Sequence, residues 1–513
     1  MSAPHDLKPF FAPRSVAVVG AGERATSSGG AVLQNLRISG FSGEIVPVNP
    51  KGGEMFGLAV RKTLGELNHP ADLAVIVIRP DLILDAVREA AASRHRHLLI
   101  LPGGFAEAGE TGRTRDRELR QLIAEHGLTV VGPNCAGIIH LPEGARFAAT
   151  FLRDMPPGPN QRGAIAFVSQ SGALVEEAIA AAHSLAIPLG TIVSVGNAVQ
   201  LSVTDYLEYL GTDTAVTAAL LYIESIEDKA RFRDVARRVA AEKPVVALIG
   251  GRTAPGARAS AAHTGAPAQD DREMDAFTAE CGVLRVKSLR RLLLAAKGFG
   301  AFPQGIGQRA LILSNSGGPG VLCTDRAAAE GLDLPLLPPA MAQALRAALP
   351  PEASVANPLD LLADAREDRF GLTLACAIKE GAQAFDAILG IHVVPFMVEA
   401  SPIVARLAEL ARSVPIPFLH AMMGTLPEKA DWFAMLERAG VPVFNDVEAV
   451  VAQVQVQGVA IEVVIIDQEH ARAFGCGRIT DDGRLRSLDD GEIALLNHGS
   501  APRIAYAGHR QCR

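Results

Sequence analysis

The stretch Ser15-Val16-Ala17-Val18-Val19-Gly20-Ala21-Gly22 decides the fold, because it joins an apolar, β-branched run to a glycine-containing turn. We expect the next helix to begin near Gly29-Gly30, so that this turn connects a strand to a helix. Further short apolar runs, separated by Ala- and Leu-rich helical stretches, follow at residues 44–48, 73–78, 97–101 and 129–131. This alternation predicts an α/β domain with a parallel, doubly wound sheet.

Two breaks rich in proline and glycine, at residues 155–160 and 302–307, divide the rest of the chain, and the strand-and-helix alternation resumes after each. We therefore expect domains at residues 7–150, 160–300 and 306–455, followed by a C-terminal extension, 456–513, of unassigned role. The second and third domains open with similar sequences, Phe167-Val168-Ser169-Gln170-Ser171-Gly172 and Leu313-Ser314-Asn315-Ser316-Gly317-Gly318. This similarity suggests that the two domains share a fold.

Composition excludes several classes of protein. The 513 residues carry a formal net charge of −7, which provides no basic field for nucleic acid. There is neither an uninterrupted apolar run of the ~18 residues that a membrane helix needs nor a signal-peptide pattern, so we expect a cytoplasmic protein without a membrane partner. The six cysteines are scattered without a C-x-x-C pair, which predicts reduced thiols and no zinc site.

One histidine lies among small residues, in the segment Ser260-Ala261-Ala262-His263-Thr264-Gly265-Ala266, which we expect to be a loop. An imidazole with a pKa near neutrality can accept a phosphoryl group and pass it to another acceptor. His263 is therefore a candidate covalent carrier. The same sequence would also suit an exposed histidine without a chemical role.

Two further motifs in the second domain support phosphoryl chemistry. Ser169-Gln170-Ser171-Gly172-Ala173 follows a predicted strand and opens a helix, where backbone N–H groups and hydroxyls can hold a phosphate. Glu224 ends another predicted strand, where its carboxylate could hold one imidazole nitrogen and leave the other nucleophilic. Each motif also has an ordinary explanation, a serine N-cap and a helix cap. Together they make a phosphohistidine site plausible.

The first domain has features of a site for a phosphate-bearing ligand. Its turn departs from the G-x-G-x-x-G pattern, and Pro47-Val48-Asn49-Pro50-Lys51 replaces the acidic residue that would bind a ribose hydroxyl. A lysine there favours coenzyme A over NAD, although Lys51 could equally be a solvated surface charge, and the glycines could serve packing alone. Val131-Gly132-Pro133-Asn134-Cys135 follows a strand at its carboxyl end, where ligands of open α/β sheets bind.

The order of these motifs resembles the NDP-forming acyl-CoA synthetases, relatives of succinyl-CoA synthetase and of ADP-forming acetate–CoA ligase. The resemblance covers roughly residues 7–455 and includes Asn315-Ser316-Gly317-Gly318-Pro319-Gly320 and Asn357-Pro358-Leu359-Asp360 in the third domain. It implies a Rossmann-like CoA-binding domain followed by two flavodoxin-like domains. It also implies the reaction acid + CoA + ATP ⇌ acyl-CoA + ADP + phosphate, through an acyl phosphate and a phosphohistidine.

The resemblance assigns roles residue by residue. It implies that His263 carries the phosphoryl group and that Glu224 orients and polarises it. The residues that it places around the phosphate are Ser169, Gln170, Ser171 and Gly172, and those that it places at the CoA site are Gly20, Ala21, Lys51, Asn134 and Cys135. No metal site is expected in this chain.

The sequence also departs from the family. Leu248-Ile249-Gly250-Gly251-Arg252 lacks the usual lysine and serine, and Ala266-Pro267-Ala268-Gln269-Asp270 replaces the usual continuation after the histidine. We find no ATP-grasp module or P-loop, so we expect an α-type subunit within an oligomer, with ADP or ATP and Mg²⁺ bound by an ATP-grasp β-type partner. The alternative is a catalytically inactive CoA-binding sensor or scaffold, and the carboxylic acid stays unidentified.

Overall fold

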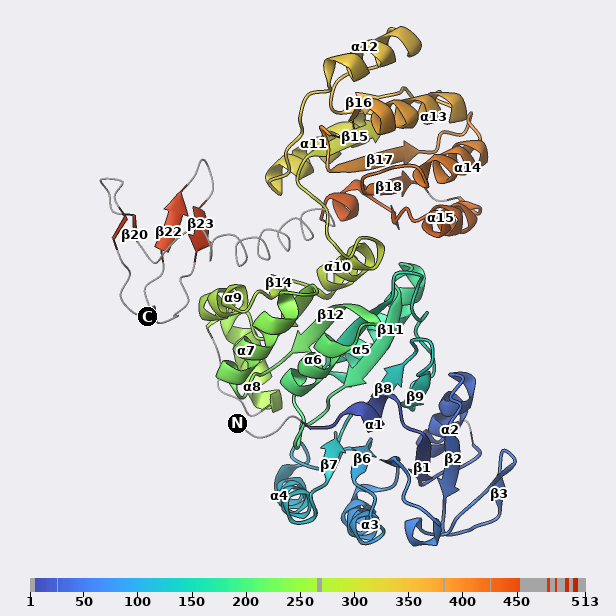
Figure 1. The fold of residues 1–513 in the computed structure, drawn as a ribbon, viewed down its shortest axis with the longest axis vertical. Coiled ribbons are helices and arrows are strands. Elements are labelled where there is room, and N and C mark those ends of the chain that lie inside the picture. The colour runs from blue at the N-terminus through green and yellow to red at the C-terminus, as the bar shows by residue number, and fades with distance from the viewer. Residues whose placement is uncertain are drawn as a thin grey trace.

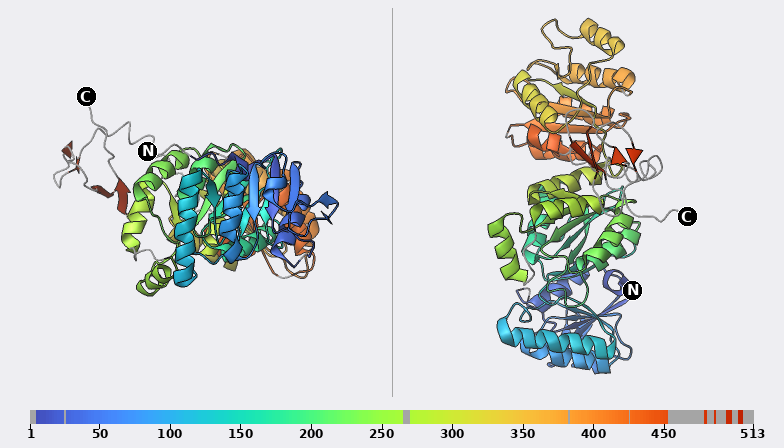
Figure 2. Two further views of the ribbon diagram at one scale, coloured as in Figure 1. Left: turned by 90° about the horizontal axis from the view of Figure 1, so that it is seen from below. Right: turned by 90° about the vertical axis from the view of Figure 1, so that its left-hand side faces the viewer.

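A computed structural model describes residues 5–24, 26–264, 270–381, 383–424 and 426–452, without the side chains of 262–264. Of the predicted extension, 456–513, it describes only the backbone of two hairpins, formed by strands β20 (Arg478–Ile479), β21 (Leu485–Arg486), β22 (Ala494–Asn497) and β23 (Pro502–Ala505). Figure 1 and the right-hand view of Figure 2 show three domains stacked in chain order along the longest axis.

The first domain contains a five-stranded parallel sheet with the order β2-β1-β5-β6-β7. Its strands are β1 (Ser15–Val19), β2 (Glu44–Val48), β5 (Leu73–Ile76), β6 (His97–Ile100) and β7 (Thr129–Val131). Its helices are α1 (Lys8–Phe11), α2 (Ser28–Ile38), α3 (Pro80–Ala92), α4 (Gly109–His126) and the short η1 (Leu64–Glu66), and β3 (Glu54–Met55) pairs with β4 (Leu58–Ala59). The strand order reverses between β1 and β5, and ligands bind at such a switch point.

The second domain has a seven-stranded sheet with the order β14-β13-β12-β10-β11-β8-β9. Its parallel strands are β10 (Ala164–Ser169), β11 (Leu189–Ser194), β12 (Val216–Ile223), β13 (Val245–Ile249) and β14 (Leu284–Val286). Its helices are α5 (Gly172–Ser184), α6 (Val203–Thr212), α7 (Lys229–Ala240), α8 (Ala254–Thr264), α9 (Asp271–Glu280) and α10 (Leu289–Ala301). The antiparallel strands β8 (Gly137–His140) and β9 (Phe147–Thr150) extend this sheet. They lie within residues that we expected in the first domain, and Phe147 packs in one hydrophobic cluster with Leu33 of that domain.

The third domain repeats the strand order, β16-β15-β17-β18-β19, in a five-stranded parallel sheet. Its strands are β15 (Ala310–Ser314), β16 (Leu359–Asp360), β17 (Ala387–Val393), β18 (Phe418–Met423) and β19 (Val443–Phe444). Its helices are α11 (Gly317–Ala329), α12 (Pro339–Ala348), α13 (Glu367–Cys376), the π-helical η2 (Ala377–Gly381), α14 (Ala400–Ala411) and α15 (Lys429–Arg438). The prediction that domains two and three share a parallel α/β fold is confirmed, because their parallel strands follow the same flavodoxin-like order.

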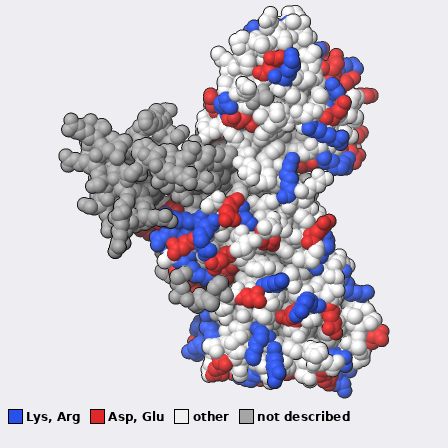
Figure 3. All heavy atoms as spheres, in the orientation of Figure 1, with Lys and Arg blue, Asp and Glu red and all other residues white. Residues whose placement is uncertain are grey.

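Charge and polar side chains give few signs of other functions within the described part of the chain. Figure 3 shows both signs of charge interspersed on the face that it presents. No described helix is both long and apolar enough to cross a bilayer, and no group of three or more candidate metal ligands occurs among the described residues. The four described cysteines are free thiols, whereas Cys476 and Cys512 lie outside the described residues.

Helix α10 connects the cores of the second and third domains. Most of its apolar side chains pack in the second domain, but Leu294 packs in the core of the third. Lys297 is 3% exposed, and its ammonium group donates to the carbonyl of Leu185 at 2.8 Å and contacts the carboxylate of Glu437 on α15. The same carboxylate accepts the N–H of Val443 at 2.9 Å. A buried ion pair therefore joins the two domains.

Breaking this ion pair should destabilise the protein. We expect Lys297→Met to lower the free energy of unfolding by about 3–5 kcal/mol, because it leaves Glu437 buried without its counter-charge. The double variant Lys297→Met/Glu437→Leu should recover most of that loss, since it leaves no unpaired charge. Denaturant unfolding of the three proteins measures both effects, and equal stability of Lys297→Met and the parent would contradict the prediction.

Two buried histidines lie side by side in the third domain. His392 on β17 and His420 on β18 have ring centroids 6.0 Å apart, and their four ring nitrogens have no hydrogen-bond partner within the described structure. Gly390 makes room for this arrangement, because a Cβ at that position would lie 2.6 Å from Nδ1 of His420. Burial lowers the pKa of His392 to about 4 and that of His420 to about 3. Both rings are therefore neutral near pH 7.

The histidine pair should make the third domain sensitive to acid. A histidine whose pKa is lowered by folding binds its proton more readily in the unfolded chain, so stability falls as the pH drops below ~6.5. Between pH 7 and pH 5 each ring should lower the free energy of unfolding by roughly 2 kcal/mol. His420→Phe should therefore reduce the difference in unfolding free energy between the two pH values by about that amount. Urea unfolding at both pH values measures it, with exposed His69→Phe as control. An unchanged pH dependence in His420→Phe would refute this account.

Candidate functional site

The turn between β10 and α5 is held by its own serine hydroxyl. Ser169 is fully buried, and its hydroxyl donates to the carbonyl of Ser171 at 2.7 Å and accepts the N–H of Ser171 at 3.1 Å. Ser171 is the N-cap of α5, without a side-chain capping bond, and Gly172 begins the helix. Ser169 therefore shapes the turn, and its predicted contact with phosphate stays a prediction. Ser171 and Gly172 lie at the positive end of the helix dipole.

Gln170 links this turn to the end of the neighbouring strand β12. Its amide oxygen accepts the N–H groups of Glu224 and Ser225, the latter at 3.1 Å, and its amide nitrogen donates to the carbonyl of Ser225 at 3.2 Å. The whole amide is thus engaged with the backbone around Glu224. In this structure the side chain of Gln170 positions Glu224, and the prediction that Gln170 holds phosphate stays a prediction.

Glu224 follows β12 directly and lies beside α8. The hydroxyl of Tyr222 shares a hydrogen bond with Glu224, and burial together with that charge raises the pKa of Tyr222 to about 12. The Ser260 hydroxyl donates to the main-chain carbonyl of Glu224 at 3.4 Å. The strand end is therefore connected to the helix that carries position 263.

The backbone of His263 belongs to the last turn of α8, so the expectation that it lies in a loop was wrong. Alanine-rich sequence favours a helix, Pro255 is tolerated in its first turn, and the hydroxyl of Thr253 accepts the N–H of Gly256 at 3.2 Å. The side chain of His263 and residues 265–269 lie outside the described part of the structure. Position 263 comes three residues after Ser260, which is nearly one helical turn.

A pocket opens between the carboxyl ends of β12 and β13 and the helices α8 and α9. Its lining includes Glu224, Ser225, Gly251, Ser260 and Asp271. The strand ends and α8 thus place one of the two candidate catalytic residues, Glu224, in the wall of a pocket. The lining also includes the apolar side chains of Ile223 and Ile249 from the strands and the guanidinium of Arg285.

The predicted CoA-site residues of β1 and β2 lie at the carboxyl edge of the first sheet. Gly20 has a φ of +91°, and a Cβ there would lie 2.3 Å from the carbonyl oxygen of Val77, so only glycine fits. The side-chain amide of Asn49 donates to the carbonyl of Ala21 at 2.9 Å and its oxygen accepts the N–H of Lys51 at 3.0 Å. Lys51 itself is exposed, so its charge is available at this edge.

The other two predicted CoA-site residues, Asn134 and Cys135, differ in their exposure to solvent. Asn134 has a φ of +59°, and its side chain donates to Asn197 at 3.1 Å, so it lies at the surface of the site. Cys135 is 3% exposed, its thiol donates to the carbonyl of Ile100 at 3.4 Å, and burial raises its pKa to about 12. Cys135 is therefore a buried, neutral thiol, and its predicted place at the CoA site stays a prediction.

Sequence reasoning missed Glu107 and Asn197. The carboxylate of Glu107 accepts the side-chain N–H of Asn197 at 2.5 Å and the backbone N–H groups of Gly104 and Phe105. Burial opposes ionisation of Glu107, but these hydrogen bonds lower its pKa below the ordinary value. The only local sequence signal for Glu107 is the pair Gly103-Gly104 that precedes it, and no motif marks Asn197.

These contacts bring the edges of the first and second sheets together. The N–H of Ala136, next to Cys135, donates to the hydroxyl of Ser194 at the end of β11, at 2.9 Å. A Cβ on Gly172 would lie 3.7 Å from the Cβ of Ala136. The N-terminus of α5 and the Asn134 loop are therefore neighbours, so a ligand of the first domain could reach a phosphate held by the second.

Comparison with known families divides the chain into three matched regions. Residues 14–141 match the model of a CoA binding domain, and residues 162–299 match that of a succinyl-CoA ligase like flavodoxin domain. Residues 310–455 match the model of a Ligase-CoA domain. The matches follow the order in which the three sheets occur.

Individual proteins match over most of the chain. The alpha subunit of acetate–CoA ligase [ADP-forming] II from Pyrococcus furiosus is 33% identical over 449 residues, which cover 86% of this chain and 95% of that subunit. Acetate–CoA ligase [ADP-forming] I from Archaeoglobus fulgidus is 34% identical over 72% of this chain, but the match spans 52% of that longer protein. A solved structure, dinucleotide forming acetyl-coenzyme A synthetase 1 from Ca. Korarchaeum cryptofilum in complex with phosphate and ADP, superposes with a TM-score of 0.83 at 29% identity and covers 90% of this chain and 99% of its own.

Proposed function

This chain belongs to the family of ADP-forming acyl-CoA ligases, and from this premise we propose that it is the α-type subunit of such a ligase, acting with a separate ATP-grasp subunit. The reaction is acid + CoA + ATP ⇌ acyl-CoA + ADP + phosphate. The observation that carries the proposal is the contact between the Asn134 loop and the N-terminus of α5, beside the pocket that contains Glu224.

The first domain fits coenzyme A. Gly20 allows a phosphate to approach the backbone closely, Lys51 offers an exposed positive charge, and Asn134 has its amide at the junction with the second domain. Gly20, Ala21, Lys51 and Asn134 would hold coenzyme A, which supplies the thiol that accepts the acyl group. The junction would then place that thiol near the phosphate at α5.

The second domain would carry the phosphoryl group. An imidazole nitrogen of His263 bonds to phosphorus as the P–O bond to the carboxylate of an acyl phosphate breaks, and the carboxylic acid leaves as its anion. Glu224 would hold the other imidazole nitrogen and stabilise the positive charge that develops on the ring. The N–H groups at the start of α5 and the hydroxyl of Ser171 would hold the phosphate oxygens.

The nucleotide would be bound by a second chain. The Pyrococcus furiosus relative is called an alpha subunit and is matched over 95% of its length, whereas the longer Archaeoglobus fulgidus relative is matched over about half. The match over nearly all of an alpha subunit supports a separate ATP-grasp subunit that binds ADP or ATP with Mg²⁺. The alternative, an inactive CoA-binding sensor or scaffold, is less well supported, because the chain retains His263 and Glu224 and its matched relatives are named as ligases.

The phosphoryl transfer can be tested without nucleotide. We expect the purified chain, given radiolabelled phosphate and a panel of acyl-CoAs, to acquire acid-labile, base-stable label, because His263 would receive the phosphoryl group of an acyl phosphate. His263→Ala should lose the label while calorimetric titration shows unchanged CoA affinity. The acyl-CoA that gives the most label identifies the acid. Label that persists in His263→Ala, or no label with any acyl-CoA while CoA binds, would contradict the proposal.

Lys51 should contribute to CoA binding. We expect Lys51→Ala to weaken CoA affinity by roughly five- to tenfold, because a charge-assisted contact to a phosphate contributes about 1 kcal/mol or somewhat more. Calorimetric titration measures this, with Lys287→Ala, an exposed lysine of the second domain, as a matched control. Equal CoA affinity of the Lys51 variant and the parent would reject the assignment.

A further inference from the structure

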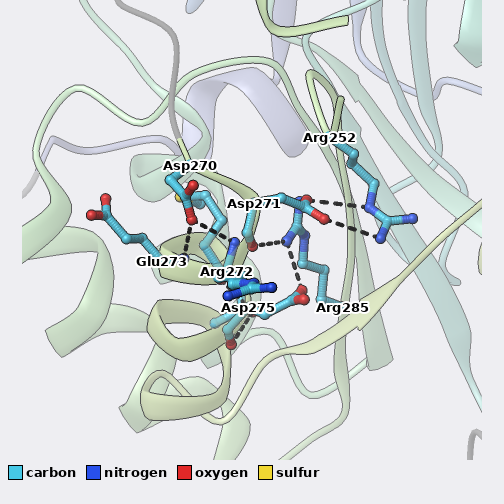
Figure 4. A network of polar contacts seen from close by, with 9 residues as sticks. Arg252, Asp270, Asp271, Arg272, Glu273, Asp275 and Arg285 are labelled. Atoms are coloured by element: carbon cyan, nitrogen blue, oxygen red, sulfur yellow. Dashed lines mark hydrogen bonds and ion pairs between the residues drawn. The ribbon is translucent and has the colours of Figure 1, made fainter. Parts of the chain in front are cut away.

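Three charged residues to which the proposed reaction assigns no role are joined by ion pairs at the pocket, as Figure 4 shows. The guanidinium of Arg252 contacts both carboxylate oxygens of Asp271, at 3.4 and 3.2 Å. The guanidinium of Arg285 contacts the same carboxylate at 2.6 Å. We call Arg252, Asp271 and Arg285 the brace. Asp271 is the shared member, so each arginine reaches the other only through it.

Arg285 anchors the brace to the sheet. It comes from β14, and its side chain is 6% exposed. A second nitrogen of its guanidinium donates to the main-chain carbonyl of Asp271 at 2.9 Å and to the carboxylate of Asp275 at 2.6 Å. Burial opposes ionisation of Asp271, but hydrogen bonds from Arg285 and Arg252 lower its pKa. A nearly buried guanidinium is thus neutralised by two carboxylates of α9, and this favours one fixed geometry.

The brace joins the two ends of the segment that carries position 263. Arg252 precedes the first residue of α8 by two positions, and Asp271 is the first residue of α9, so the ion pair joins two residues that are 19 positions apart in the chain. Closing a segment at its base reduces the conformations open to it. Asp271 is also hydrogen-bonded to Arg285, which lies on β14. Both ends of the segment are therefore anchored to that strand.

The brace also contributes to the pocket wall near Glu224. Asp271 and Arg285 line the pocket together with Glu224 and Ser260. Helix α8 contacts the Glu224 carbonyl through Ser260, and Arg252, two residues before the helix begins, is held by Asp271 in the same pocket wall. The end of the helix near position 263 and the residues that lead into it are therefore restrained separately.

We propose that Arg285 is a positioning residue for phosphoryl transfer: acting through Asp271, it holds Arg252 and with it the start of α8, so that His263 meets Glu224 productively. This inference rests on the proposed function, since it assigns no chemistry to the brace itself. A small displacement of a reacting group lowers the rate steeply, whereas binding at a distant site is unaffected. Loss of the brace should therefore slow phosphoryl uptake and leave CoA affinity unchanged.

The test measures the initial rate at which the purified chain acquires acid-labile label from radiolabelled phosphate and the acyl-CoA that labels the parent best. We expect Arg285→Met, Asp271→Asn and Arg252→Met each to lower the rate tenfold or more. Arg252→Met/Arg285→Met should be no slower than either single variant, because both act through one carboxylate. The matched control is Arg272→Met, a neighbouring exposed arginine on α9 that should label at the parent rate.

Conservative variants separate positioning from general destabilisation. Asp271→Glu keeps the charge and should recover part of the rate that Asp271→Asn loses, whereas a purely structural defect would follow the melting temperature and CoA affinity measured on the same proteins. Parent-like rates in the brace variants, or rate losses that multiply in the double variant, would overturn this inference alone. A parent that takes no label while CoA binds would overturn the proposed function and this inference with it.

Discussion

The close approach of two backbones at Gly196 is the constraint on which the site depends. Gly196 has a φ of +65°, and a Cβ there would lie 2.2 Å from the carbonyl oxygen of Pro133, so no other residue fits without movement. The next N–H, of Asn197, donates to that carbonyl at 2.9 Å. These contacts hold the carboxyl edges of the first two sheets together. Together with the bond from the Ala136 N–H to Ser194, this junction brings the Asn134 loop beside the start of α5, and the amide of Gln170 connects that turn to the end of β12.

The sequence was sufficient to predict which candidate residues share an edge of a sheet, because parallel strands place all their carboxyl ends at one edge. Ser171, Gly172 and Glu224 could be assigned to one edge on that ground. The sequence did not predict hydrogen bonds between partners that are distant along the chain, such as the amide of Gln170 with the backbone of Ser225. Strand register decides such pairs, and apolar periodicity does not specify register to the residue. The helical state of position 263 was missed because small residues suit both a loop and a helix.

The second and third domains use the same turn but differ at the position that matters for chemistry. In the third domain the hydroxyl of Ser314 donates to the carbonyl of Ser316, and the amide of Asn315 pairs with both backbone groups of Val393. The corresponding amide in the second domain, Gln170, binds the backbone of Glu224 and its neighbour. The backbone geometry is therefore retained while a valine stands where the second domain has a carboxylate. The turn by itself serves the fold in both domains. The proposed chemistry of the second domain comes from Glu224, which stands where the third domain has Val393.

Helix α10 restricts how this architecture can be rearranged during evolution. Its side chains complete the core of one domain and, through Leu294 and Lys297, the core and charge balance of the next. A recombination event that removed the third domain together with α10 would expose apolar surface on the second domain. A break after α10 would instead leave Glu437 of the third domain without its partner Lys297. The second and third domains are therefore tied together through one helix, and the first domain is tied to the second by a shared hydrophobic core, in which Leu33 and Phe147 pack in one cluster with Val168.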